Sequence, residues 1–78
     1  MKFDFSHEAI KAIGRLDANT AGRVFKGIMG LPSKGDIKAL GGKHSGLFRL
    51  RVGDWRIIYA VNDNVVSIGC VLPRGDAY

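Results

Sequence analysis

The sequence has few residues that could cross-link or anchor the chain. It contains a single cysteine, so an internal disulfide cannot form, and we expect Cys70 to be a packed thiol in a reducing compartment. No apolar run approaches the roughly 20 residues that a membrane-spanning helix needs. No apolar segment with a small-residue cleavage site follows the N-terminus, which is the pattern of an export signal. We therefore expect a cytoplasmic protein that makes no contact with a membrane.

Acidic residues are also scarce relative to basic ones. Seven Asp and Glu stand against 12 Lys and Arg, which gives a net charge of +5 and a sequence pI of about 9.8. A pI in this range is typical of proteins that bind polyanions, provided that the cations collect on one surface. The positions of the arginines along the chain therefore matter more than their number.

The length of 78 residues and the apolar content of 46% predict one compact domain over residues 1–78. Periodicity and turn residues predict an α+β fold, with an N-terminal strand, two helices and a three-stranded antiparallel meander. Ser6 is the expected cap of the first helix, and Asp17 or Asn19 of the second. The expected elements are a strand over Lys2–Phe5, helices over His7–Leu16 and from the second cap to Leu31, and strands over Leu47–Val52, Trp55–Val61 and Val65–Leu72.

The segment between the helices and the meander is rich in glycine. Ser33–Gly46 includes four glycines, and this composition predicts an irregular connection.

The pair Gly53-Asp54 suits a two-residue hairpin turn, which fixes the register of the strands on either side. In this register Arg51 lies opposite Arg56, Arg49 lies opposite Ile58, and all three arginines share the face away from the core. Like charges placed directly across a hairpin are destabilising. The arginine fork suits phosphate binding, although three exposed arginines also fit a solvated face that only prevents edge pairing.

The next turn, Asp63-Asn64, predicts the register of the last two strands. It places Gly69 opposite Ile58 and keeps one alternating set of residues on the core face. That set is Val66, Ile68, Cys70 and Leu72.

Three motifs resemble a known family. They are Leu40-Gly41-Gly42-Lys43, the run from Gly46 to Tyr59 that reads GLFRLRVGDWRIIY, and the closing Arg74-x-x-x-Tyr78. In this order they resemble the RelE/ParE superfamily of bacterial and archaeal type II toxins, and the resemblance covers essentially the whole chain. It implies a RelE-like fold, in which two helices pack on a small, mostly antiparallel sheet with a concave basic face.

The resemblance to RelE implies a toxin that enters the ribosomal A site and cleaves the mRNA codon there, without a metal or cofactor. The ribose 2′-OH attacks the adjacent phosphate, and cations with an aromatic residue serve as acid, base and charge stabiliser. By resemblance, Arg49, Arg51 and Lys43 bind RNA, and Arg49 and Arg51 also assist the base. Arg56 stabilises the phosphorane, Arg74 protonates the leaving oxygen, and Tyr78 stacks or acts as base.

Two positions depart from the RelE pattern. Pro73 stands where many relatives have a histidine, and Gly75 where a basic residue is frequent. His44 is the one candidate in the glycine-rich connection that could replace the missing imidazole. Two alternatives therefore stay open: a ParE-like toxin that inhibits DNA gyrase without chemistry, and an inactive relative that binds only its antitoxin.

All three readings imply protein partners. The resemblance implies a RelB-like cognate antitoxin, the ribosome and mRNA as partners, and operator DNA bound by the toxin–antitoxin complex through the antitoxin. The antitoxin of such a toxin commonly folds on binding and lays a helix along the toxin. The sheet edge and the helix residues Val24, Phe25 and Ile28 are candidate docking surfaces, although core packing also explains apolar residues at this spacing.

Overall fold

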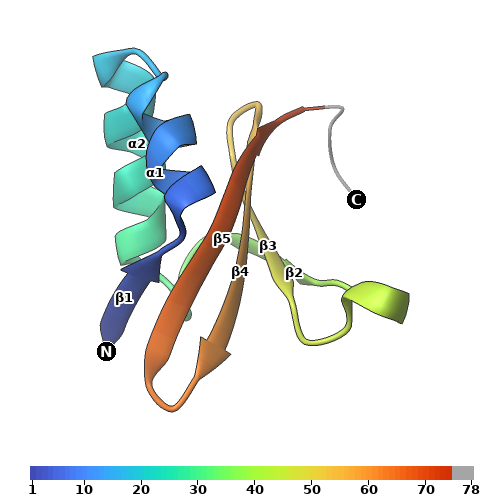
Figure 1. Cartoon of the computed structure of the whole chain (residues 1–78). Helices are drawn as coiled ribbons and strands as arrows, with labels where there is room; N and C mark the ends of the chain where they lie inside the picture. The colour runs from blue at the N-terminus through green and yellow to red at the C-terminus, as the bar shows by residue number, and fades with distance from the viewer. Residues whose placement is uncertain (75–78) are drawn as a thin grey trace.

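In the computed structural model, which describes residues 1–74, two helices cover one face of a five-stranded sheet (Figure 1). The strand order is β1-β5-β4-β3-β2, with β1 parallel to β5 and every other pair antiparallel. This arrangement confirms the predicted α+β fold, with one strand more than expected. The elements are β1 (Lys2–Phe5), α1 (His7–Gly14), α2 (Ala18–Met29), β2 (Asp36–Ala39), the 3₁₀ turn η1 (Gly42–His44), β3 (Phe48–Val52), β4 (Trp55–Asn62) and β5 (Val65–Pro73).

The additional strand is β2, and it lies in the segment that was expected to be irregular. That expectation is wrong for Asp36–Ala39, which pairs with β3 and forms an edge of the sheet. Gly35 precedes it with φ 120°, and a Cβ there would lie 2.6 Å from Cδ1 of Leu50. Only glycine therefore lets the chain enter this edge so close to the core.

Both helices begin at the predicted caps and end two residues earlier than predicted. Ser6 accepts a hydrogen bond from the backbone N–H of Ala9, and Asp17 accepts one from that of Thr20. The residues after each helix form shorter i→i−3 bonds, such as Leu16 N to Ile13 O (3.1 Å) and Leu31 N to Ile28 O (3.0 Å). This tightening satisfies carbonyls at the helix ends that lack an α-helical partner.

The core lies between the helices and the sheet. In α1, Ile13 and Leu16 pack against the core, whereas Ile10 is 58% exposed. The buried residues of this core cluster are Ala9, Val24, Ile28, Leu31, Leu50, Ile57, Tyr59, Val66, Ile68 and Val71.

A β-bulge interrupts the pairing of β4 with β5. Tyr59 of β4 pairs with Ile68, but the residue before it, Ile58, pairs with Cys70, so Gly69 is the extra residue. The prediction that Gly69 lies opposite Ile58 is therefore wrong. Because a one-residue shift moves side chains to the other face, the expected core positions of Cys70 and Leu72 are also wrong. Val71 is buried in their place.

The bulge is tied to the start of α1. Ser6 donates a hydrogen bond from its backbone N to Ile68 O (2.9 Å) and another from its hydroxyl to Gly69 O. The same hydroxyl accepts from Ala9 N at 3.0 Å. One side chain therefore caps the helix and satisfies the carbonyl that the bulge leaves outside the ladder.

The packing of α2 on β3 predicts opposite effects for two glycine substitutions in the same helix. A Cβ at Gly27 would lie 2.8 Å from Cγ2 of Val52, whereas a Cβ at Gly22 would meet no atom within 4 Å. Val52 is β-branched and moves with difficulty. We expect Gly22→Ala to raise the free energy of unfolding by up to about 1 kcal/mol and Gly27→Ala to lower it by about 1–3 kcal/mol. Urea unfolding measures both, and equal stabilisation by the two variants would contradict the close approach.

The cap of α2 predicts a pH dependence of stability. Hydrogen bonds from the Thr20 side chain and then from its backbone lower the pKa of Asp17 below its ordinary value of 3.8. The ionised carboxylate therefore stabilises the fold above the unfolded pKa, and this contribution disappears as the pH falls below the ordinary value of 3.8 and through the lower folded pKa. Asp17→Asn keeps a capping oxygen without the charge, so its thermal midpoint should fall less over this range. Parallel pH profiles for the two proteins would refute the role of the charge.

Candidate functional site

The candidate site is the face of the sheet that the helices leave uncovered, which we call the open face. The register of the four antiparallel strands, together with the alternation of side chains along each strand, shows which residues share this face. These are Asp36 and Lys38 of β2, Arg49 and Arg51 of β3, Arg56, Ile58 and Ala60 of β4, and Ser67, Cys70 and Leu72 of β5.

Cations lie directly opposite cations at two positions of this face. Arg51 pairs with Arg56, as predicted from the hairpin, and Lys38 pairs with Arg49. Each such pair costs a few tenths to about 1 kcal/mol relative to neutral neighbours. A face that served only to keep the protein in solution would more readily mix the two signs, so the arrangement favours an anionic ligand.

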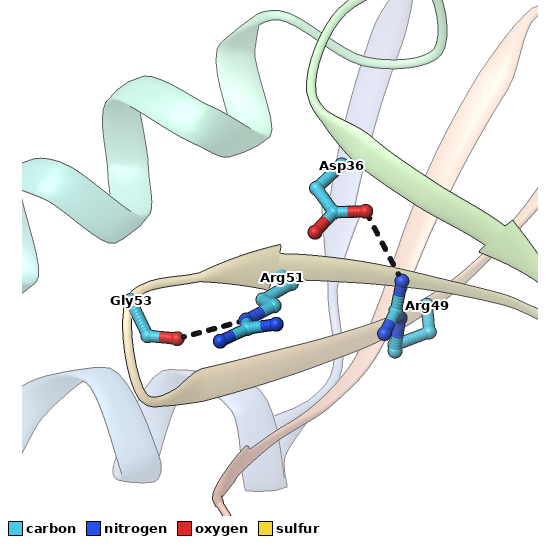
Figure 2. A network of polar contacts seen from close by, with 4 residues as sticks. All are labelled: Asp36, Arg49, Arg51 and Gly53. Carbon is cyan, nitrogen blue, oxygen red and sulfur yellow. Dashed lines mark hydrogen bonds and ion pairs between the residues drawn. The ribbon is translucent and has the colours of Figure 1, made fainter.

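Two of these arginines are held by contacts with the protein (Figure 2). Arg49 places Nη2 3.3 Å from Oδ1 of Asp36, and Arg51 donates from Nε to the carbonyl of Gly53 at 3.4 Å. The side chain of Arg49 is only 20% exposed. Its aliphatic part lies on the same face as Ile58, its cross-strand partner, which is 4% exposed. Long cationic side chains commonly cover apolar surface in this way.

Two guanidinium nitrogens on the open face are buried without a partner among the described residues. They are Nε of Arg49 and Nη1 of Arg56. A buried donor on a charged group that makes no hydrogen bond is costly, and native structures usually satisfy it. Arg49 and Arg56 lie on adjacent strands, with Ile58 opposite one and two residues from the other. The two guanidinium groups therefore lie on neighbouring strands of the open face, where an anion such as a phosphate would meet both positive charges.

The sequence prediction for the chain end falls partly outside the described residues. The backbone N of Arg74 donates to Asp54 O at 2.6 Å, which holds Arg74 at the end of the sheet where Arg51 and Arg56 lie. Arg74 is exposed. Tyr78 lies outside the residues that the structure describes.

The structure separates Lys43 and His44, the remaining predicted residues, from Arg51 and Arg56. Lys43 and His44 belong to η1, which precedes β3 at its Phe48 end, whereas Arg51 and Arg56 lie at the other end of β3 and β4. Lys43 is exposed, and His44 is partly buried. In Figure 1, η1 projects beyond the sheet edge at β2.

A hollow of about 490 Å³ lies beside the cations on the open face. Its lining is mostly apolar, with Leu47, Ile58, Ala60 and Cys70 among its residues, and Glu8 is the one charged residue among the described residues that line it. Sequence reasoning missed this hollow because it placed Cys70 in the core. The one signal for it was Gly69, since an isolated glycine inside a strand is typical of a bulge.

Other groups contribute less to the chemistry of this site. Burial raises the pKa of Tyr59, which is 2% exposed on the helix side of the sheet, so its phenol stays protonated. Among residues 1–74 no group of three His, Cys, Asp or Glu side chains is arranged to hold a metal ion. The helices in the same part of the chain are too short or too polar to cross a membrane.

Comparison with known proteins identifies the family. Residues 3–78 match the family model described as "ParE toxin of type II toxin-antitoxin system, parDE". A search of curated proteins gives no significant match.

Several solved structures share the fold. The archaeal RelE–RelB complex from Pyrococcus horikoshii OT3 contains a chain that is 32% identical, with a TM-score of 0.75 and 97% coverage of both chains. The RelB–RelE antitoxin–toxin complex from Methanococcus jannaschii gives 26% identity, a TM-score of 0.75, and coverage of 90% of this chain and 88% of that one. The toxin–antitoxin complex RelBE2 from Mycobacterium tuberculosis, at 24% identity, matches with a TM-score of 0.81 over 94% and 96% of the two chains. With a family match over nearly its whole length and this fold, the chain belongs to the RelE/ParE superfamily of type II toxins.

Proposed function

We propose that this toxin is a metal-independent, ribosome-dependent mRNA endoribonuclease that inhibits translation. The observation that carries the proposal is the pair of buried, unpartnered donors, Arg49 Nε and Arg56 Nη1, on a face where cations oppose cations. Donors fixed before the substrate arrives stabilise charge that develops in the transition state, and this is usually the largest catalytic contribution. A phosphodiester at this position would meet both arginines.

The proposed reaction needs two proton transfers, one from the 2′ hydroxyl and one to the 5′ oxygen. The ribose 2′ oxygen forms a bond with the adjacent phosphorus as its proton passes to a base, and the bond from phosphorus to the 5′ oxygen breaks as that oxygen gains a proton. Arg49 and Arg51 would bind the phosphate oxygens, and Arg56 would stabilise the pentavalent phosphorane. We assign Arg74 to stabilising the charge on the leaving oxygen, which takes its proton from water, and Tyr78 to stacking or to the base.

The assignment to Arg56 is the strongest of these because of its surroundings. Arg56 is partly buried between Arg51 on β3 and Leu72 on β5, its two cross-strand partners. A restrained guanidinium loses less conformational entropy when it binds an oxyanion than an exposed one does. Arg74 is exposed, and with a pKa above about 12 an arginine donates a proton reluctantly. Arg74 therefore suits charge stabilisation better than full proton transfer.

A second candidate function is a ParE-like toxin that binds DNA gyrase without catalysing a reaction. Two observations favour it: the family match is to ParE toxins, and Pro73, opposite Trp55 at the end of β5, supplies no imidazole. The basic open face would then bind protein rather than RNA. A third candidate, an inactive relative that binds only its antitoxin, is consistent with the same two observations.

Substitution of Arg56 distinguishes these functions. We expect Arg56→Ala to reduce mRNA cleavage by about 10²-fold or more, because it removes one preorganised donor. Primer extension in translating cells measures new mRNA 5′ ends after controlled expression of the toxin. Arg15→Ala, which removes an exposed arginine at the C-cap of α1, is the matched control and should cleave like the wild type.

Each other outcome assigns the protein differently. Growth arrest with intact mRNA, unchanged in Arg56→Ala, would contradict the nuclease and support the gyrase inhibitor. Absence of arrest from the wild-type chain would leave the antitoxin-binding relative. Circular dichroism of the purified variants shows whether Arg56→Ala is folded, so that a loss of activity is not misread.

We further propose that a RelB-like antitoxin is the protein partner of this chain. The Pyrococcus and Methanococcus relatives are toxins in complex with RelB. Of the three candidate docking residues, Val24 and Ile28 are fully buried and belong to the core, whereas Phe25 is 50% exposed. Met29, one turn further along α2, is 41% exposed, so the two side chains form a small apolar surface at i, i+4 spacing.

This surface predicts that Phe25→Gln weakens antitoxin binding on the order of tenfold, because exposed aromatic residues often dominate the energy of an interface. Stability should change little, since half of the side chain is already exposed. Titration calorimetry with the cognate antitoxin gives the affinity, and Ile10→Gln on α1, which also alters an exposed apolar residue, serves for comparison. Wild-type affinity in Phe25→Gln would exclude this surface of α2.

A further inference from the structure

We propose that Asp36 is the resident counter-ion of Arg49 and that a substrate phosphate displaces its carboxylate on binding. This competition sets how selectively the open face binds nucleic acid. This inference rests on the proposed function in one respect only, namely that the anionic ligand of the open face is RNA. The motif resemblance did not include Asp36, and the irregular connection expected around it concealed its position on β2.

The register of β2 shows that the contact of Asp36 is selective. Its direct cross-strand partner is Arg51, yet its carboxylate lies 3.3 Å from Arg49, which is opposite Lys38. Arg51 instead donates to the carbonyl of Gly53 at the hairpin turn. Figure 2 shows the two arginines directed to these different acceptors. Asp36 thus offsets the like-charge neighbours Arg49 and Lys38 on the edge of the sheet.

The contact is of a kind that a phosphate can replace. The separation of 3.3 Å exceeds the roughly 2.7–2.9 Å of a strong charge-assisted hydrogen bond. The carboxylate side chain is 61% exposed, and exposed ion pairs contribute little to stability. Arg49 meanwhile keeps Nε buried and unpartnered. Asp36 contacts Nη2 alone, so a phosphate has only this one contact to replace.

The carboxylate of Asp36 affects which anions can bind at Arg49. A lone anion would have to compete with a carboxylate that is already tethered beside Arg49, and the tether gives that carboxylate a high effective concentration. An RNA strand offers several phosphates at once, so contacts at Arg51 and Arg56 help it to displace Asp36. The resident carboxylate therefore disfavours isolated anions and weakly held polyanions more than a correctly placed strand.

The test compares two variants that add the same charge at different places. Asp36→Asn and Asp4→Asn each remove one exposed carboxylate on the open-face side of an edge strand. Asp4 lies on β1, three strands from β3, which is about 14 Å at the usual strand spacing. The probe is a single-stranded RNA of about twelve nucleotides with 2′-O-methyl riboses, which cannot be cut by 2′-OH attack. Fluorescence anisotropy at several salt concentrations gives the Kd.

We expect Asp36→Asn to lower the Kd for this RNA about fivefold to tenfold relative to Asp4→Asn at low salt. The slope of log affinity against log salt should stay the same in the two variants, because the phosphate contact at Arg49 forms in both complexes. In an Arg49→Ala background the difference between the two aspartate variants should vanish.

Equal Kd values for Asp36→Asn and Asp4→Asn would overturn the proposal, and so would weaker binding by Asp36→Asn, which would show that Asp36 orients Arg49 and does not compete for it. The failure of the proposed function looks different. If the toxin does not cleave mRNA in cells but Asp36→Asn still tightens RNA binding, the nuclease fails and the counter-ion stands. If cleavage occurs and the two variants bind alike, only the counter-ion fails.

Discussion

The arrangement of the open face depends on the β-bulge at Gly69. Before the bulge, the even-numbered residues Val66 and Ile68 of β5 face the helices; after it, the odd-numbered Val71 does. The change of parity brings Cys70 and Leu72 to the open face, where Leu72 lies opposite Arg56 and Cys70 opposite Ile58. One residue therefore decides which side chains of β5 lie beside the arginines of the open face.

The bulge persists because its cost is offset locally. Ser6 satisfies the carbonyls of Ile68 and Gly69, and in the same geometry caps α1 through Ala9. The parallel pairing of β1 with β5 ends at Phe5 and Ile68, one residue before these contacts. The first helix and the shift in the last strand are thus fixed by the same side chain, so the helix layer and the open face form as one cooperative structure.

The open face is the place where the chain departs from what stability alone would favour. Cations oppose cations at two positions, and buried donors of Arg49 and Arg56 lack partners among the described residues. The core is packed without any buried polar residue among residues 1–74. The stability of this core offsets the cost of the charges on the open face. Such conflicts are expected at functional sites. The exposed apolar residues Phe25 and Met29 lie on the opposite, helical layer, so the proposed binding of RNA and the proposed binding of an antitoxin would use separate surfaces.

Local patterns in the sequence determined the helices and the four strands other than β2, the cap at Ser6, a second cap at Asp17 or Asn19, and the hairpin register that pairs Arg51 with Arg56, because turn length and alternation act between near neighbours. The motif run from Gly46 to Tyr59 also determined the superfamily. Only the tertiary structure decided the bulge at Gly69, the strand at Asp36–Ala39 and hence the contact of Asp36 with Arg49. These features depend on partners far away in the chain: Ser6 reaches Gly69 across 63 residues, and Asp36 reaches Arg49 across 13. Local propensity contains no information about such long-range hydrogen bonds and charges, so the sequence predicted where the arginines lie but not what holds them.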